Sequence, residues 1–429
     1  MAGYGAAPAE RSKARNEIAM MPPVAPPGGR CRSIVVVRLP HQCHDVNVMP
    51  TLKKYRKLIV IAAPIVLCAL FLLIVEAGLR LGFGLPKGQF ASWFPGQSGL
   101  YPENSVIDMT WGAIPYTVKV NSHGFRGPEF LSNKPGEIFT IAALGDSVTD
   151  GFFVDNQDTY PYLLQVILTE RYQRQAQVIN GARGGASIDK EFAILRQTLL
   201  PFKPDMVVLT FVGNDISDIR GKTREQLVSL NLDPGSKPHR ELARLALVKT
   251  AVGEAAYDRY LSLTRKQYQA ARRSLKSGRD RYDIAGGTNF LENVRICEER
   301  YEKSEGILLA EPYAAETTAL IDNYLFALGE MSKFCKQSGI RLVFVYFPSY
   351  FVVYKPGASN QIRDLLQAGC ARLAIPFLDL TETFRTAGAT KALHLAPVDF
   401  HLNPAGNLVL AQAIAEGIAP YVGGKDSTR

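Results

Sequence analysis

The sequence predicts a three-layer α/β/α domain on a five-stranded parallel sheet, preceded by one transmembrane helix and interrupted by a helical insertion. Three observations carry this prediction. From residue 139 onwards, short apolar segments alternate with longer mixed ones, and alternating βα units favour a parallel sheet covered by helices on both faces. Residues 58–75 form an uninterrupted, almost wholly apolar run. Residues 217–312 break the alternation over a stretch too long for a plain loop.

The N-terminal 57 residues are basic and carry no sustained helical or strand periodicity. They contribute +7 to the formal net charge of +9, so the rest of the chain is nearly neutral. A nucleic-acid partner therefore has no electrostatic support. Because residues 1–57 are rich in Pro, Ala and Arg, we expect a disordered cytoplasmic tail. Met49 directly precedes what resembles the start of a signal anchor, and we expect that residues 1–48 are not translated.

Residues 58–79 are predicted to cross the cytoplasmic membrane once, as a signal anchor. The apolar run alone spans about 27 Å as a helix, close to the thickness of the hydrocarbon core. Basic residues between 53 and 57 directly precede it, which places the N-terminus in the cytoplasm. The remainder then lies outside, in the periplasm, with 85–138 as a connector that contains short strands. A cleaved signal peptide is the alternative.

The cysteines and the short metal-binding motifs limit what else the chain can hold. Cys297, Cys335 and Cys370 follow the predicted span, so at most one disulfide forms among them and no disulfide framework is implied. No CxxC or HExxH pattern is present, and the sequence supports neither a metal site nor a cofactor.

The apolar pattern gives the elements of the domain, which we expect to cover residues 139–420. The predicted strands are 139–145, 176–181, 206–212, 341–348 and 375–380. The predicted helices are 159–173, 189–200, 317–338, 360–373 and 404–418. A further strand, 116–120, leads into the domain. The insertion, 217–312, reads as mostly helical and follows a strand end, where it could cover a pocket.

A serine follows the first strand of the domain, in the sequence Leu144-Gly145-Asp146-Ser147. Sites in parallel sheets gather at the carboxyl ends of the strands, and a small-residue turn there exposes a hydroxyl as a nucleophile requires. Thr149 stands where the nucleophile elbow of the α/β-hydrolases has its second glycine, so that elbow is absent. The stretch resembles block I of the SGNH (GDSL-type) hydrolases instead.

Other stretches resemble further blocks of this family, in the same order. Residues 180–187 match block II, in which the oxyanion glycine stands five residues after the asparagine; this selects Gly185, with Gly184 as the rival. Asn214, after an apolar strand, matches the block III asparagine, whose amide can donate to a developing negative charge. Residues 121–127 are similar to a segment that precedes block I in membrane-anchored relatives.

Block V is represented by Asp-Phe-His-Leu-Asn-Pro-Ala-Gly, which begins at Asp399. Neutral histidine is the usual base near pH 7, and His401 alone among the histidines after the predicted span combines this context with a neighbouring carboxylate. In the family the acid most often stands three residues before the histidine, as Asp-x-x-His, but here that position is Val398. Asp399 stands two residues before His401, and this Asp-x-His spacing also occurs among members that resemble this chain. Asp379, at the end of the last strand, is the alternative orienting acid.

The resemblance covers residues 121–216 and 341–420, and it implies a flavodoxin-like sheet and a Ser-His-Asp esterase. Ser147 would be the nucleophile, His401 the base and Asp399 the acid that orients it. The backbone N–H groups of Ser147 and Gly185, with the Asn214 side chain, would form the oxyanion hole.

The expected substrate is an O-acyl ester, for example O-acetyl, of a polysaccharide or a lipid. Two alternatives remain open. The same residues could transfer the acyl group to a hydroxyl of an envelope polysaccharide, which would make the protein an O-acyltransferase. An inactive SGNH-like domain could instead serve as a binding or assembly subunit, although the intact Ser147, Asn214 and His401 argue against it. Other protein partners cannot be inferred from the sequence.

Overall fold

The computed structural model describes residues 50–83, 100–111, 114–133, 138–173, 175–229, 250–264, 305–355, 357–395 and 399–422. Most of the predicted tail, much of the connector and a large part of the insertion lie outside these residues, as do Met49 and Cys297.

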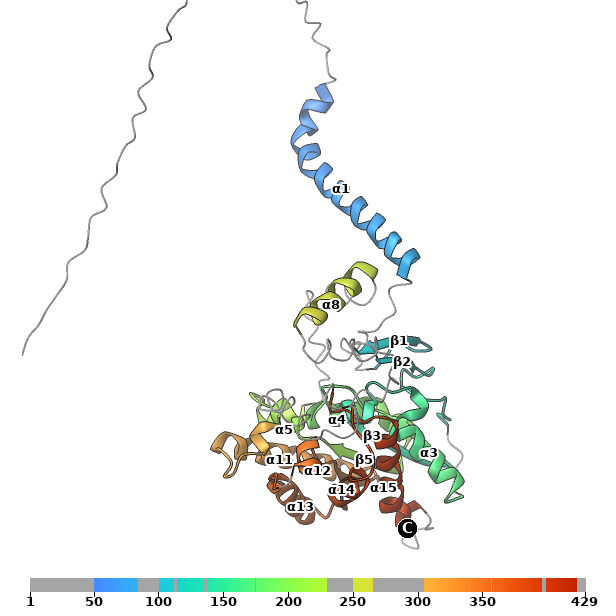
Figure 1. Ribbon diagram of the computed structural model, residues 1–429, viewed down its shortest axis with the longest axis vertical. Coiled ribbons are helices and arrows are strands. Elements are labelled where there is room, and N and C mark those ends of the chain that lie inside the picture. The colour runs from blue at the N-terminus through green and yellow to red at the C-terminus, as the bar shows by residue number, and fades with distance from the viewer. Residues whose placement is uncertain are drawn as a thin grey trace, which may run out of the picture. The chain divides into compact units, whose positions relative to one another are not determined.

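The described elements follow the chain order labelled in Figure 1. The strands are β1 (Val106–Trp111), β2 (Ile114–Lys119), β3 (Phe139–Gly145), β4 (Ala176–Asn180), β5 (Met206–Phe211), β6 (Arg341–Tyr346) and β7 (Phe377–Asp379). The longer helices are α1 (Pro50–Phe83), α3 (Tyr160–Glu170), α4 (Ile188–Ile194), α8 (Ala251–Thr264), α11 (Ala315–Gln337), α13 (Gln361–Leu373), α14 (Thr381–Gly388) and α15 (Pro404–Val422). The shorter ones are α2 (Ser147–Asp150), α5 (Asn214–Asp218), α6 (Arg224–Val228), α12 (Tyr350–Tyr354), η2 (Asn156–Asp158), η3 (Leu195–Leu199), η4 (Leu200–Phe202) and η6 (Gly306–Leu308).

The main sheet has five strands in the order β4-β3-β5-β6-β7, and each neighbouring pair is parallel. Numbered from its first strand, this is the order 2-1-3-4-5 of flavodoxin-like folds. The predicted flavodoxin-like parallel sheet is confirmed. A separate antiparallel hairpin, β1 with β2, precedes it. It contains most of the predicted strand 116–120.

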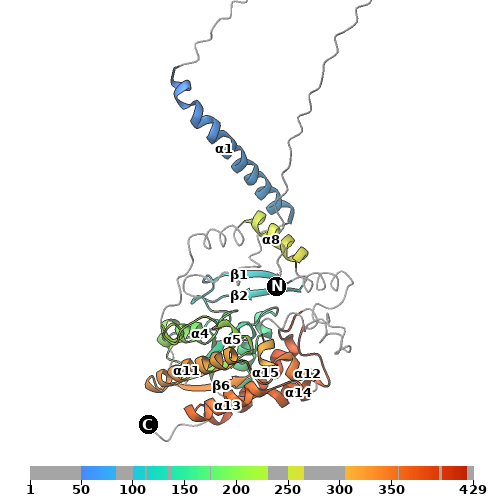
Figure 2. The ribbon, with the colours of Figure 1, turned by 90° about the vertical axis from the view of Figure 1, so that its left-hand side faces the viewer.

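Two apolar cores lie on the two faces of the sheet, because successive strand residues point to opposite sides. Ala142 and Val207 face a core completed by α4, α11 and α13. Ile141 and Val208 face a second core completed by α3, α14 and α15. Both faces are thus covered, which explains why the strands are continuously apolar. The predicted three-layer arrangement is confirmed, and Figure 2 shows β6 with helices around it.

Helix and strand ends differ from the predictions where local chemistry intervenes. The helix predicted over 189–200 is α4 followed by a π turn and a 3₁₀ turn, because Pro201 cannot donate a backbone hydrogen bond. β7 is shorter than the predicted strand 375–380, and it pairs only with β6 at the edge of the sheet. The short helices α2, α5 and α12 were not predicted, since segments of four or five residues carry too little periodicity.

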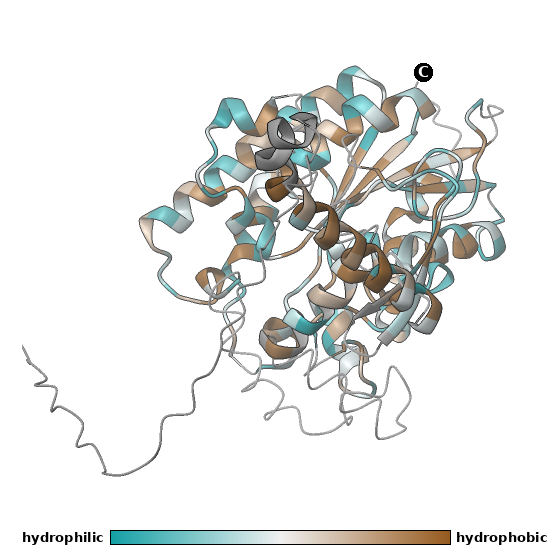
Figure 3. Cartoon of the chain, turned by 90° about the horizontal axis from the view of Figure 1, so that it is seen from above, coloured by the Kyte–Doolittle hydropathy of each residue, from teal (hydrophilic) through white to brown (hydrophobic). Residues whose placement is uncertain are grey.

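The N-terminal helix α1 is longer than the predicted span at both ends. Residues 50–57, predicted as part of a disordered tail, are helical, consistent with the absence of glycine and proline from residues 51–57. Within α1, the segment Val60–Gly82 is long and apolar enough to cross a membrane or act as a signal anchor. Its large apolar side chains are exposed, and Figure 3 shows the helix as predominantly hydrophobic.

Two of the three cysteines after α1 are described, Cys335 and Cys370, and both are free thiols inside the core. Burial raises the pKa of each thiol to about 12. Since the thiolate is the reactive form of cysteine, both side chains serve as small apolar residues of the core.

Candidate active site

Ser147 is the first residue of α2, directly after β3, and it is partly exposed. The turn depends on Gly145, whose φ of +151° is one that other residues rarely adopt. A Cβ on this glycine would lie 2.2 Å from Thr149 Oγ1 and 2.9 Å from the Thr210 carbonyl oxygen. Only glycine therefore fits, and the chain turns sharply enough to bring the serine hydroxyl to the edge of the sheet.

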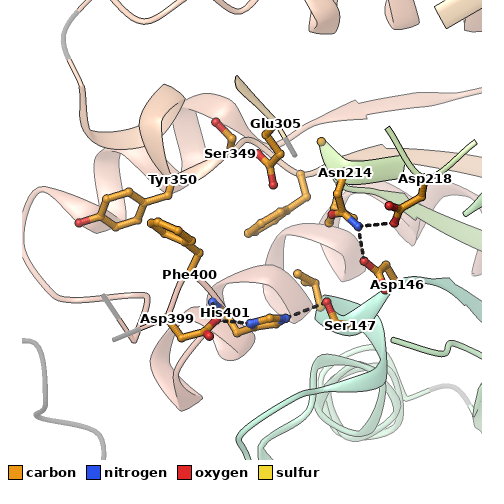
Figure 4. Close-up of a pocket in the computed structure, with 14 residues that line it drawn as sticks. Asp146, Ser147, Asn214, Asp218, Glu305, Ser349, Tyr350, Asp399, Phe400 and His401 are labelled. Atoms are coloured by element: carbon orange, nitrogen blue, oxygen red, sulfur yellow. Dashed lines mark hydrogen bonds and ion pairs between the residues drawn. The ribbon is translucent and has the colours of Figure 1, made fainter. Parts of the chain in front are cut away.

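His401 meets this serine from the loop before α15. Its Nε2 lies 2.7 Å from Ser147 Oγ, as the dashed line in Figure 4 shows. Its Nδ1 contacts the Asp399 carboxylate, which also accepts a hydrogen bond from the His401 backbone N–H at 3.1 Å. This double contact is how an acid only two residues before the histidine still reaches its ring. The structure thus brings together Ser147, His401 and Asp399.

The alternative acid, Asp379, does not contact His401 but binds other residues. Its carboxylate accepts hydrogen bonds from the Thr381 backbone N–H at 2.9 Å and the Thr381 hydroxyl at 2.6 Å, at the start of α14. It also contacts Arg363 at 3.3 Å. Asp379 therefore stabilises the turn at the start of α14 and forms an ion pair with Arg363 at the surface.

Asp146 is the residue on which the predicted oxyanion donors converge, and sequence reasoning assigned it no role. Its buried carboxylate accepts hydrogen bonds from the Gly185 backbone N–H and, at 2.6 Å, from Asn214 Nδ2. Burial raises the pKa of Asp146, while hydrogen bonds from Asn214, Gly185 and the Ser147 backbone oppose the rise. The three predicted oxyanion donors therefore lie close together, around the two carboxylate oxygens of Asp146.

The Asn214 amide is also bonded on its other side. Nδ2 donates to Asp218 Oδ2 at 3.0 Å, across one turn of α5 (Figure 4). Asp218 is exposed at the rim of the cavity. Both hydrogens of the amide therefore point to carboxylate oxygens in this structure.

Gly184 and Gly185 differ in what surrounds them. The Gly184 N–H donates to the buried carboxylate of Asp150 at 3.1 Å, and a Cβ there would lie 2.2 Å from the Phe152 ring. Gly185 has a φ of +73°, and no atom lies within 4 Å of where its Cβ would be. Of the two glycines, only Gly185 directs its N–H to the carboxylate that Asn214 also binds.

Arg126 supports the turn that carries Ser147. Its buried guanidinium donates to the carbonyl oxygens of Asp150, at 3.0 Å, and Gly151, at 2.7 Å. The Asp150 carboxylate in turn accepts hydrogen bonds from the Tyr101 hydroxyl at 2.9 and 3.0 Å, and from Gly184. The segment 121–127, which contains Arg126, therefore holds the C-terminal end of α2 in place. In the sequence this segment stood out only through its resemblance to membrane-anchored relatives.

Two consecutive phenylalanines enclose the ring of His401. Phe152 stacks on it with ring centroids 5.5 Å apart and 25° between planes, and Phe153 meets it edge-on at 4.9 Å and 87°. Phe153 is buried and has a φ of +69°, the left-handed region that costs a non-glycine residue about 1 kcal/mol. Backbone strain is therefore located directly beside the histidine.

The polar residues described above open onto a cavity of about 300 Å³. One part of its wall is aromatic, formed by Phe347, Tyr350 and Phe400, and Tyr350 packs on Phe400 with centroids 5.3 Å apart. Asp218 and Glu305 bring carboxyl groups to the rest of the wall (Figure 4). Among the residues that the structure describes, no group of three His, Cys, Asp or Glu side chains is arranged to hold a metal ion.

Comparison with known proteins places the chain in a family. The GDSL-like Lipase/Acylhydrolase family matches residues 143–409, more than half of the chain. No curated protein matches the sequence significantly.

Three solved structures are similar to parts of the chain. A catalytic mutant of Axe2, an acetylxylan esterase from Geobacillus stearothermophilus, is 15% identical, with a TM-score of 0.37 over 67% of this chain and 96% of its own. TesA is 14% identical, with a TM-score of 0.36 over 66% and 98%. A putative lipolytic protein of the G-D-S-L family from Desulfitobacterium hafniense DCB-2 is 11% identical, with a TM-score of 0.34 over 65% and 98%.

A three-layer α/β/α fold, with a serine and a histidine in contact at the carboxyl edge of its sheet, is the architecture of an α/β hydrolytic enzyme. The match over residues 143–409 makes the class specific: the chain belongs to the GDSL-like lipase/acylhydrolase family. It is an SGNH hydrolase.

Proposed function

We propose that the protein is a membrane-anchored extracytoplasmic serine esterase that hydrolyses an O-acyl ester of a polysaccharide through Ser147, His401 and Asp399. The observation that carries the proposal is the 2.7 Å contact between His401 Nε2 and Ser147 Oγ, which continues through Nδ1 to Asp399. The Asp399 side chain is 2% exposed and that of His401 20%, so the acid is shielded from water while the base faces the cavity.

The reaction follows from these contacts. Ser147 Oγ attacks the acyl carbonyl carbon, and its proton passes to His401 Nε2. The tetrahedral intermediate expels the alcohol, which takes the proton from His401 and leaves an acyl-serine. A water molecule then gives a proton to His401 and attacks the acyl carbon. The second intermediate releases the carboxylic acid, and His401 returns the proton to Ser147 Oγ, which restores the serine. Asp399 holds the imidazole in the tautomer that presents Nε2 to the serine.

The Ser147 and Gly185 N–H groups and the Asn214 side chain are the proposed oxyanion donors. Support comes from their convergence on the Asp146 carboxylate, since a set of donors that satisfies one negative oxygen group suits another beside it. To bind the substrate oxygen, Asn214 must exchange its bond to Asp218. The Ser147 and Gly185 N–H groups must share their hydrogens between Asp146 and the substrate oxygen, because both are bonded to Asp146 in this structure. Asp218 is exposed and belongs to a five-residue helix, so a rotation of the Asp218 side chain is enough to release the Asn214 amide hydrogen.

The cavity wall favours a saccharide over a lipid. A sugar ring combines an apolar face, which packs on aromatic rings such as those of Tyr350 and Phe400, with hydroxyl groups that donate to carboxylates. Asp218 supplies such a carboxylate in the same cavity. A volume of about 300 Å³ is enough for one sugar ring and a short acyl group.

The proposed location is the cytoplasmic membrane, with α1 as the single span and the catalytic domain in the periplasm. Support comes from the apolar segment Val60–Gly82 and from the basic residues before it. Protease added to intact spheroplasts should digest the domain that follows α1. A domain that becomes accessible only after lysis would reverse this orientation.

The decisive experiment uses the full-length protein in detergent, with p-nitrophenyl acetate and an acetylated polysaccharide as substrates. Ser147→Ala and His401→Ala should each lose turnover by about 10⁴-fold or more, and Ser147→Ala should also lose labelling by a fluorophosphonate probe. Labelling that survives in Ser147→Ala would refute the nucleophile. Labelling without hydrolysis, but with acyl transfer to an added sugar, would make the protein an O-acyltransferase. Neither labelling nor turnover would indicate a binding or assembly subunit.

A further inference from the structure

Glu305 reaches the cavity from a segment outside all the family blocks, and a glycine makes room for it. The carboxyl carbon and one oxygen of Glu305 lie 2.7 Å from the place where a Cβ on Gly213 would stand. Gly213 directly precedes Asn214. Any other residue before this asparagine would therefore displace the Glu305 side chain from its present position.

The segment that carries Glu305 is firmly held. Leu308 is 3% exposed and belongs to the core on one face of the sheet. Leu309 packs against Tyr350 and Phe351, and the Tyr313 hydroxyl donates to the Leu308 carbonyl oxygen at 3.1 Å. The backbone on both sides of Leu308 is thus fixed, so the position of Glu305 is a property of the fold.

A second, smaller space lies next to the main cavity. This crevice has a volume of about 10 Å³, room for about one water molecule, and apolar residues such as Leu308, Leu309, Val352 and Ile362 form much of its wall. Gly213, Glu305, Phe347 and Ser349 line both spaces. These four shared residues form the partition between the cavity and the crevice.

Within this partition, Glu305 contributes a carboxyl group at the end of a long side chain. Figure 4 shows its carboxyl group on the opposite side of the cavity from Ser147 and His401, with Tyr350 and Phe400 on one flank and Asn214 on the other. A chain that extends from an acyl carbon on Ser147 across the cavity meets this carboxyl group before it reaches the apolar crevice. The carboxyl group occupies the space through which the chain would have to pass, so it blocks the chain by its volume.

We infer that Glu305 is a specificity-determining residue that restricts the acyl group to about the size of acetyl by closing off the apolar crevice. The inference rests on the proposed esterase function and narrows it from O-acyl esters to O-acetyl esters. Glu305→Ala removes a carboxymethyl group, which joins the crevice to the cavity. Glu305→Gln leaves the occupied volume unchanged and is the matched control.

The first test compares kcat/KM for p-nitrophenyl acetate, butyrate and hexanoate in the full-length protein. We expect acetate to be preferred by the wild type, and we expect the hexanoate-to-acetate ratio to rise about tenfold or more in Glu305→Ala. In Glu305→Gln the ratio should stay within about threefold of the wild type. A ratio unchanged in Glu305→Ala, or an equal rise in both variants, would overturn the inference.

A second readout does not depend on turnover. 1-Hexanol should raise the melting temperature of Glu305→Ala by more than that of the wild type or Glu305→Gln, because only the alanine variant has room for the alkyl chain. A wild type without serine-dependent activity would contradict the proposed function. Even then, the comparison with 1-hexanol would still test whether Glu305 closes off the crevice. Equal shifts in all three proteins would overturn it.

Should Glu305→Ala fail to fold, Glu305→Ser opens nearly the same space. The same rise in the hexanoate-to-acetate ratio and the same response to 1-hexanol are expected of it, and their absence would equally contradict the inference.

Discussion

The side-chain amide of Asn214 donates a hydrogen bond to the carboxylate of Asp146 at 2.6 Å. Asp146 follows β3 and Asn214 follows β5, and these strands are neighbours in the sheet, with Gly145 opposite Thr210. The bond therefore ties together the carboxyl ends of two adjacent strands. It also fixes the plane of the amide relative to Ser147, the next residue after Asp146.

Asp146→Asn should lower kcat on p-nitrophenyl acetate by about 10²-fold, with a much smaller change in KM. The variant has nearly the same shape, but one carboxylate oxygen becomes an NH₂ group that cannot accept from Gly185 or Asn214. The proposed oxyanion donors then lose their orientation, and the loss of one such donor typically costs 10²–10³ in turnover.

Asp205→Asn is the matched control for this substitution, because Asp205 accepts a hydrogen bond from the Thr140 backbone N–H at 2.8 Å, near the opposite end of β3. It should affect stability while leaving kcat near the wild-type value. Wild-type kcat in Asp146→Asn would show that the carboxylate does not orient the donors.

Replacements of Phe153 should separate backbone strain from catalysis. Phe153→Gly and Phe153→Ala both remove the ring that contacts His401, so kcat should fall by about tenfold in both. Only glycine accepts a φ of +69° without strain, so Phe153→Gly should be more stable than Phe153→Ala by about 1 kcal/mol in urea unfolding. A kcat that instead follows stability across the two variants would argue against a positioning role for the ring.

His394 should make the protein less stable in acid. This side chain is buried beside Tyr350 and Tyr354, and burial, with a smaller contribution from the charge of His401, lowers its pKa to about 3. In the unfolded chain histidine titrates near 6.5. The stabilisation is thus fully present above about pH 6.5 and is lost progressively as the pH falls toward 3.

His394→Phe should consequently flatten the fall of the melting temperature between pH 6.5 and 4. Phenylalanine suits the aromatic surroundings of this position. A melting temperature that falls with the same slope in both proteins would mean that His394 is protonated in the folded state.

Glu191 should have the opposite effect on the pH dependence. It is fully buried, and neither carboxylate oxygen has a hydrogen-bond partner among the described residues. Burial, followed by the charges of Asp146 and Asp189, raises its pKa well above the usual value of 4.5. The folded protein therefore keeps a proton that the unfolded chain releases, and stability is lost as the pH rises through this interval.

Glu191→Gln should show this directly. The amide is not ionisable, so the melting temperature of the variant relative to the wild type should increase as the pH rises above 4.5, the usual pKa of glutamate. A constant difference over that range would show that Glu191 is ionised in the folded protein.

The sheet could be anticipated from the sequence for physical reasons, and the resemblance to the family blocks pointed to Ser147, Asp399 and His401, whose side chains are in contact. A strand covered on both faces must be a continuous apolar run, and such runs stand out against the polar segments between them. The serine and the histidine lie in short motifs directly after a strand and before a helix, where the neighbouring sequence defines the turn. Asp399 is close enough in sequence to contact His401 through a local turn.

The remaining features depend on contacts between distant segments. Nothing near Arg126 in the sequence reveals that it binds the carbonyl oxygens of Asp150 and Gly151. Glu305 carries no motif, and its place beside Gly213 follows from the packing of Leu308 in the core. The left-handed backbone of Phe153 could not be predicted either, because bulky residues rarely adopt a positive φ.

The contact between Ser147 and His401 joins residues that are 254 positions apart in the chain. In the proposed mechanism the serine has no base until the loop before α15 has docked, and this docking needs almost the whole polypeptide. On this mechanism Ser147 is an ordinary, unreactive hydroxyl while the chain is being synthesised. A nascent or prematurely ended chain that stops before His401 cannot attack esters, so activity appears only once the domain is complete.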